Sequence, residues 1–256
     1  MKIKNTLAFQ FLKTIGLLLS FIAAGLFLDS KFFLEYSNYG QEFSNFILIT
    51  VLLYLYYRAN KRTREQIIYA VIIGVIGEYL FCKGFGMYTY RLDNVPHYVP
   101  PGHAIMYLGV YYFIRQPKVV VNKKNLEITF YVVNGLFATY FLLFKNDVLG
   151  FSFTVLTFYI VTKKPRERLF YLAMYFSIAG LELIGTFYEC WYWPSTWFGK
   201  IDFIPSANPP SGISFFYFGL DLGCLFFYKL RHKVAWSRMK NIRRIREQKS
   251  LVVSSN

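Results

Sequence analysis

The feature that most constrains this chain is a series of apolar runs long enough to cross a lipid bilayer. Of its 256 residues, 55% are hydrophobic and only 17% are charged, whereas about a quarter of a soluble domain is charged. Apolar runs of this length predict membrane-spanning helices. We therefore expect an all-α, polytopic helical membrane protein with about eight transmembrane helices, at residues 6–28, 44–57, 66–84, 102–115, 127–144, 148–162, 169–189 and 212–230.

The basic residues predict how these spans are oriented. Most of the 29 Lys and Arg residues lie at the start, in the connections after the second, fourth and sixth spans, and in the tail. The positive-inside rule then places both termini in the cytoplasm, in a multi-pass integral membrane protein of the cell or inner membrane. The same rule explains the net charge of +15 without a nucleic-acid partner. We expect the basic cytoplasmic tail, residues 231–256, either to lie on anionic inner-leaflet lipids or to serve as a solvated topology anchor.

Two stretches of the chain resemble each other. Setting Gly77 of "GEYLFCKGFGMYTY" against Gly180 of "GLELIGTFYECWYW" aligns Tyr88 with Trp191 and Tyr90 with Trp193 without a gap. The simplest account is a tandem 4+4 parallel repeat, with a first four-helix repeat in residues 1–125 and a second in residues 126–230. The alternative is chance similarity between aromatic membrane sequences.

Acidic residues inside apolar runs are candidates for chemistry. Glu78, Glu182 and Asp221 lie well within predicted spans, and Glu78 and Glu182 are one residue out of register in the repeat. A carboxylate at mid-bilayer costs on the order of 3 kcal/mol, so such groups usually face the bundle interior. There a neutral carboxylic acid can act as a general acid, and His103, which follows "VPPG", can relay its proton. The alternative role is hydrogen bonding between helices.

Aromatic residues flank both acidic segments in an alternating pattern. Tyr88 and Tyr90 precede "VPPGH", and Trp191 and Trp193 precede "SANPPSG". An interfacial aromatic belt explains such residues, but rings that line a cavity would also suit a flat, apolar or transiently cationic ligand. The predicted substrate-binding residues are Tyr88, Tyr90, Trp191, Trp193, Tyr107, Tyr217 and Asn208, whose amide could hold one end of the ligand.

No cofactor or metal site is expected from the sequence. Three histidines are too few for a histidine-rich di-metal oxygenase, and three cysteines have no metal-like spacing. The segment "GFG" at 84–86 lacks the length and the strand context of a dinucleotide fingerprint. We expect the cysteines to be unbridged thiols.

The pattern "E…GFGMYTY…VP" from Glu78 to Pro100, followed by "WYW…IPSAN" from Trp191 to Asn208, resembles the integral-membrane carotenoid hydratases. It is similar, more distantly, to the small membrane carotene cyclases. The likeness covers about 80 residues and short motifs, and "PPGH" and "NPPSG" depart from it. It implies cofactor-free hydration or cyclisation of an isoprenoid, with Glu78 or Glu182 protonating an alkene and Asp221 or Glu182 receiving a proton or orienting water.

Three functions are consistent with these features. The first is a membrane enzyme that acts on a lipid or isoprenoid through its paired carboxylates. The second is a transporter or carrier whose halves rock about the same acidic site. The third is a non-catalytic multi-pass module. The oligomeric state is not predicted.

Overall fold

The computed structural model describes residues 6–242, except the side chain of Asp221, and this part of the chain is a helical bundle. In chain order its helices are α1 (Leu7–Phe11), the π-helical η2 (Leu12–Gly16), α2 (Leu17–Leu28), the 3₁₀ turn η3 (Lys31–Glu35), α3 (Gly40–Arg58), α4 (Lys61–Glu78), the π-helical η4 (Tyr79–Gly84), α5 (Val99–Phe113), α6 (Pro117–Val121), α7 (Lys123–Lys145), α8 (Val148–Thr162), α9 (Arg168–Phe187) and α10 (Ser214–Arg231).

The predicted all-α class is confirmed, and each of the eight predicted ranges coincides with a helical segment. Segments α1–η2–α2 and α4–η4 are each continuous helices. Within the described residues, four helical segments are long and apolar enough to cross a membrane: Leu7–Leu28, Lys61–Gly84, Lys123–Lys145 and Arg168–Phe187. Four such helices indicate that the chain is located in a membrane.

Local capping explains where several helices begin and end. The side chain of Asn60 accepts a hydrogen bond from the Thr63 amide at the start of α4, and Asp147 does the same for Gly150 at the start of α8. Helix α7 ends at Asn146, which is left-handed with φ 53°, a conformation that asparagine tolerates better than most residues. These caps satisfy backbone groups that a helix end would otherwise leave without partners.

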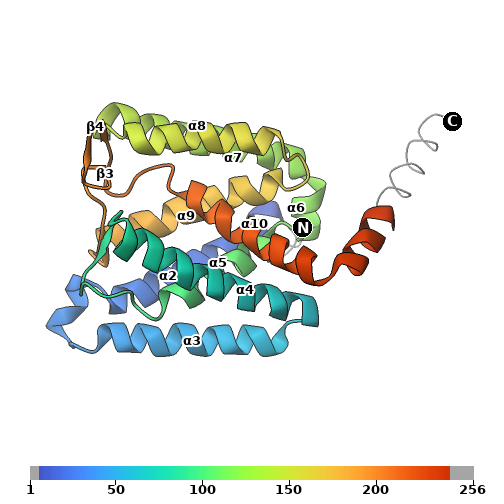
Figure 1. Cartoon of the computed structure of the whole chain (residues 1–256), viewed down its shortest axis with the longest axis horizontal. Helices are drawn as coiled ribbons and strands as arrows, with labels where there is room; N and C mark the ends of the chain where they lie inside the picture. The colour runs from blue at the N-terminus through green and yellow to red at the C-terminus, as the bar shows by residue number, and fades with distance from the viewer. Residues whose placement is uncertain (1–5, 243–256) are drawn as a thin grey trace.

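The helices form a layered bundle in which α3 lies at one edge and α7 with α8 at the opposite edge (Figure 1). Between these edges α4 packs on α5 and α10, and α9 packs on α2, α5, α7 and α10. The connection between α5 and α7 lies at one end of the bundle, together with the end of α10 (Figure 1). The short strands β3 (Thr196–Trp197) and β4 (Ile201–Pro205) lie at the other end.

A two-stranded sheet joins the loop after η4 to the loop after α9. Strand β1 (Thr89–Tyr90) pairs antiparallel with β2 (Trp191–Tyr192), so that Thr89 faces Tyr192 and Tyr90 faces Trp191. The ladder continues with a hydrogen bond from the Arg91 amide to the Cys190 carbonyl, 2.9 Å long. This pairing brings together two segments that lie about a hundred residues apart in sequence, above the central helices.

Candidate functional site

The β1–β2 pair directs four aromatic rings toward the centre of the bundle. Successive side chains of a strand point to opposite faces. Tyr88, Tyr90, Trp191 and Trp193 are accordingly buried, whereas Tyr192, between the two tryptophans, is 55% exposed. The alternation noted in the sequence is therefore an inward-facing set on two paired strands.

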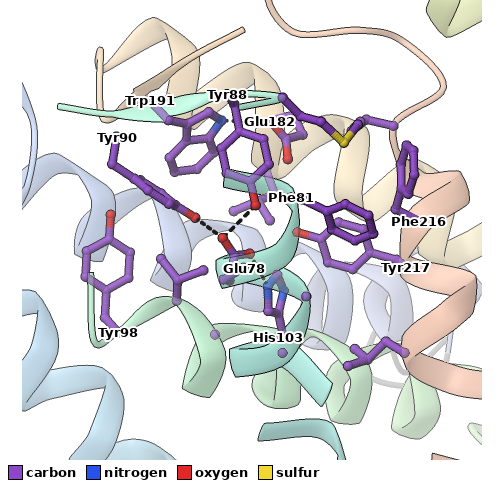
Figure 2. A pocket seen from close by; sticks show the side chains of 18 of the residues that line it. Glu78, Phe81, Tyr88, Tyr90, Tyr98, His103, Glu182, Trp191, Phe216 and Tyr217 are labelled. Atoms are coloured by element: carbon purple, nitrogen blue, oxygen red, sulfur yellow. Dashed lines mark hydrogen bonds and ion pairs between the residues drawn. The ribbon is translucent and has the colours of Figure 1, made fainter. Parts of the chain in front are cut away.

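Glu78, the last residue of α4, accepts three hydrogen bonds. The hydroxyls of Tyr88 and Tyr90 both donate to its Oε2 atom at 2.6 Å, and Nε2 of His103 lies 2.6 Å from Oε1 (Figure 2). Burial, followed by the nearby Glu78 carboxylate, raises the pKa of both Tyr88 and Tyr90 well above the ordinary value. Both phenols therefore stay protonated and remain donors.

Glu182, on α9, is held by nitrogen donors instead. The indole N–H groups of Trp191 and Trp193 donate to its Oε2 atom, at 2.8 and 3.0 Å. Among the described residues no hydrogen bond or ion pair involves its Oε1 atom. The carboxyl is buried and lines the same cavity as Glu78, so this oxygen is left for a ligand.

The tyrosines of one segment pack against the tryptophans of the other. The ring of Tyr88 lies 4.6 Å from that of Trp193, and the ring of Tyr90 lies 6.1 Å from that of Trp191. The residues that the sequence aligns, Tyr88 with Trp191 and Tyr90 with Trp193, thus occupy exchanged places across the β1–β2 pair. Such an exchange is the arrangement that a local two-fold axis between the segments would produce.

A π-helical turn accounts for the one-residue offset between the acids. Glu78 lies 10 and 12 residues before its tyrosine partners, whereas Glu182 lies 9 and 11 residues before its tryptophan partners. Segment η4 intervenes only in the first case, and a π-bulge accommodates an extra residue within a helix. With that residue allowed for, the two carboxyls occupy matching positions.

His103 lies in the second turn of α5, because the helix begins at Val99 rather than at residue 102 as predicted. A Cβ atom on Gly74 of α4 would stand 3.0 Å from the imidazole Cδ2, so this glycine provides room for the ring. The ring of Tyr217, on α10, lies 5.0 Å from that of His103. The imidazole is thereby fixed between α4 and α10 and aimed at Glu78 (Figure 2).

These groups surround a cavity of about 340 Å³. Besides the two carboxyls, His103 and the aromatic rings, its lining is mainly aliphatic side chains and glycines of α2, α4, α5 and α10. Two lining residues, Ile76 of α4 and Leu80 of η4, are 61% and 44% exposed. The cavity therefore reaches the lateral surface of the bundle, which would face hydrocarbon if the helices span a membrane.

Glycines leave part of this space empty. Gly102 and Gly219 both line the cavity, and a Cβ atom built on either meets no heavy atom within 4 Å. On the far side, Gly185 makes room for the indole of Trp191, whose ring would overlap a Cβ atom there. The glycines thus open the cavity at two positions and admit a ring at a third.

Two buried aspartates, Asp29 and Asp147, fix loops around the site, and neither was among the residues predicted from the sequence. Asp29, just after α2, accepts hydrogen bonds from Arg91 at 2.5 Å and from the Tyr98 hydroxyl at 2.8 Å. Burial, followed by this carboxylate, raises the pKa of Tyr98 well above its ordinary value. Each aspartate stands beside a helix end, where an acid resembles an ordinary loop residue. The sequence signal that could have found these aspartates is an Asp next to an apolar run, in a connection with few basic residues.

Asp147 anchors the "SANPPSG" loop of the second segment. Its side chain accepts hydrogen bonds from the amides of Ala207 and Ser211, at 3.1 and 2.7 Å, as well as from Gly150. Asn208, within that loop, accepts a hydrogen bond from the Trp193 amide at 3.0 Å. The loop therefore helps to position Trp193 over Glu182.

The remaining predicted residues lie outside this cluster. Tyr107 is buried against Phe170, and neither Tyr107 nor Asn208 is among the described residues that line the cavity. Asp221 lies in α10, outside the residues whose side chains the structure describes. The cysteines Cys82, Cys190 and Cys224 are buried without a disulfide between them, as expected. Burial raises the pKa of the Cys190 thiol.

In residues 6–242 no group of three or more His, Cys, Asp or Glu side chains has the geometry of a metal site. The arrangement that is present can exchange protons with an apolar ligand. One carboxyl has an unoccupied oxygen, the other is hydrogen-bonded to an imidazole, and aromatic rings line the same cavity. No known family model, curated protein or solved structure matches this chain.

Proposed function

We propose that this protein is a multi-pass membrane enzyme that protonates a carbon–carbon double bond of an isoprenoid or similar lipid, leading to hydration or cyclisation. The observation that carries the proposal is the pair of buried carboxyls, Glu78 and Glu182, facing one largely apolar cavity. A buried acid in an apolar pocket can serve as a general acid.

The proposed topology has eight spans in two parallel four-helix repeats, with both termini in the cytoplasm. Three observations support it. The eight helical segments match the predicted spans. Glu78 with its tyrosines matches Glu182 with its tryptophans once the extra residue in η4 is allowed for. The basic α5–α7 connection and the end of α10 lie at the same end of the bundle (Figure 1). The basic tail would then contact anionic lipids of the inner leaflet.

Glu182 is the proposed proton donor. Its Oε2 atom is held by two neutral indole N–H groups, whereas Oε1 receives no donor among the described side chains, and the residue lines the cavity. A proton on Oε1 would therefore point toward a bound alkene. Glu78 differs, because three donors already occupy its two oxygens.

The Glu78–His103 pair is the proposed proton acceptor. A carboxylate hydrogen-bonded to an imidazole fixes the orientation in which the ring can accept a proton. Protonation of the alkene forms a C–H bond and breaks the Glu182 O–H bond, leaving a carbocation. Water or a second double bond then attacks the cation, and a proton leaves to the Glu78–His103 pair. One proton is given and one is taken, so the steps need no change of oxidation state.

The aromatic rings would stabilise the carbocation between protonation of the alkene and loss of the second proton. The rings of Tyr88 and Trp193 line the same cavity as the carboxyls, and cations are attracted to aromatic faces, most strongly to tryptophan. The lateral exposure of Ile76 and Leu80 gives an apolar substrate a route from the bilayer. The isoprenoid class itself rests on the resemblance to carotenoid hydratases and cyclases.

The ligand that copurifies with the protein tests this proposal. The full chain is extracted from its native membrane, and bound small molecules are identified by mass spectrometry. We expect an extended unsaturated hydrocarbon on the wild type and its loss in Gly219→Leu, because the leucine side chain would enter the empty part of the cavity. A bound sugar, amino acid or ion in place of the hydrocarbon would favour a transporter and contradict the proposal that the protein is an enzyme.

A further inference from the structure

A second cavity, of about 720 Å³, opens on the other side of α9 from Glu78. It lies between α2, α7 and α9 and is closed at one end by the loop that contains Ala207, Asn208 and Pro209. The β3–β4 end of the bundle, where α7 and α9 both finish, therefore carries this groove. None of the steps proposed above uses it.

The groove is amphipathic along its length. Its floor is apolar and consists of Ala23, Phe141, Leu183, Ile184 and Phe187. Its loop end carries the polar residues Lys145, Tyr188 and Asn208. The Asn208 Oδ1 atom is already bonded to the Trp193 amide, so the amide nitrogen is the part of that side chain available to an acceptor.

The Lys145 ammonium is not neutralised by the protein in the described part of the chain. The nearby carboxylate Asp147 accepts three backbone N–H groups, and Glu189, next to Tyr188, pairs with Lys31 at 3.0 Å. Lys145 is exposed and forms no ion pair with a described residue. A cation left unpaired beside hydrogen-bond donors, above an apolar floor, is complementary to a ligand with an anionic head and a hydrocarbon chain.

We propose that this groove binds an anionic glycerophospholipid from the leaflet at the β3–β4 end of the bundle. Its phosphate would contact Lys145 and the Asn208 amide. One acyl chain would lie along the face of α9 formed by Leu183, Ile184 and Phe187. Because Asn208 also holds the Trp193 amide, the bound lipid would stabilise the loop that positions Trp193. The proposal does not depend on the reaction assigned to Glu182.

Native mass spectrometry of the full-length chain tests this assignment. The protein is purified in detergent, depleted of lipid and incubated separately with phosphatidylglycerol and with phosphatidylcholine. We expect Lys145→Gln to retain one phosphatidylglycerol molecule fewer than the wild type. The matched control is Lys200→Gln, which removes another exposed lysine from the same end of the bundle and should leave the number unchanged. The wild type and both variants have the same basic tail, so any anionic lipid bound there adds equally to each count and does not affect the difference.

A second variant tests the apolar floor without altering charge. Leu183 is 40% exposed on α9, so Leu183→Trp would fill the groove from its surface and should also lose one phosphatidylglycerol. Equal retention of phosphatidylglycerol by the wild type and Lys145→Gln would overturn the proposal. So would equal retention of phosphatidylcholine and phosphatidylglycerol by the wild type.

Discussion

At the scale of single residues, the two buried glutamates differ in what surrounds them. Glu78 has two phenols and an imidazole within hydrogen-bonding distance, whereas Glu182 has two indole N–H groups on one oxygen only. Phenols and imidazole can both give and accept protons, but an indole N–H only donates a hydrogen bond. The first site is therefore suited to transferring protons onward and the second to holding one acid in a fixed orientation.

Removing one indole donor should weaken catalysis without emptying the site. We expect Trp193→Phe to lower the rate of substrate conversion by about ten- to a hundredfold, since Glu182 becomes charged as it gives up its proton and a hydrogen bond to a charged group contributes about 1.5–3 kcal/mol. Tyr192→Phe is the matched control, because Tyr192 points away from the cavity. The measurement is the initial rate in isolated membranes. Equal rates for the two variants would contradict the assigned role of the indole.

The candidate acids and rings could be recognised from the sequence because charge inside an apolar span and alternating aromatics are local patterns. Glu78, Glu182, His103, Tyr88, Tyr90, Trp191, Trp193 and Tyr217 do line one cavity. Tyr107 and Asn208 were predicted to bind substrate with them, Asn208 through its amide, but the structure puts Tyr107 against Phe170 and Asn208 against the Trp193 backbone. Distances of this kind depend on tertiary packing, which periodicity does not encode.

At the scale of elements, helix positions were predictable and connections were not. Apolar runs set the helix boundaries within a few residues, as for Val148–Thr162. The β1–β2 pair has only two residues in each strand, too short for any alternation rule, and it forms because the loops meet across the bundle. The π-helical η4 was visible only indirectly, as the one-residue offset between Glu78 and Glu182.

The contact between α9 and β2 depends on a single glycine. A Cβ atom on Gly185 would overlap the Trp191 indole, so we expect Gly185→Ala to destabilise the protein by about 1–3 kcal/mol, the usual cost of overpacking. Gly102→Ala is the control, since its Cβ meets nothing within 4 Å. Thermal unfolding in one detergent compares the two variants. A midpoint for Gly185→Ala as high as that of Gly102→Ala would show that the indole can move aside freely.

At the scale of the whole molecule, the site lies where the two proposed repeats meet. Rings from β1 and β2 exchange places across their antiparallel pair, and the carboxyls come from α4 and α9. The two proposed halves differ in one respect: His103 faces Glu78, whereas no imidazole of the described chain contacts Glu182. In the proposed mechanism this difference supplies one acid and one acceptor.

The proposed topology makes a prediction about the connections. Reporter fusions after residues 60, 118, 165 and 242 should all report the cytoplasmic side, because these positions follow even-numbered spans and lie among basic residues. Fusions after residues 38, 94, 146 and 200 should report the opposite side. Opposite locations for residues 60 and 242 would rule out the arrangement in two parallel four-helix repeats.

The most direct test of the central claim follows a proton from solvent into carbon. Isolated membranes that contain the full chain are incubated in D₂O, and their lipids are analysed by mass spectrometry for non-exchangeable deuterium. If Glu182 protonates an alkene, the wild type should form a hydrated or cyclised isoprenoid that carries one deuterium on carbon. Glu182→Gln should lower its formation by about 10²–10⁴-fold, the usual contribution of a general acid. Equal deuteration by the wild type and Glu182→Gln would contradict the claim.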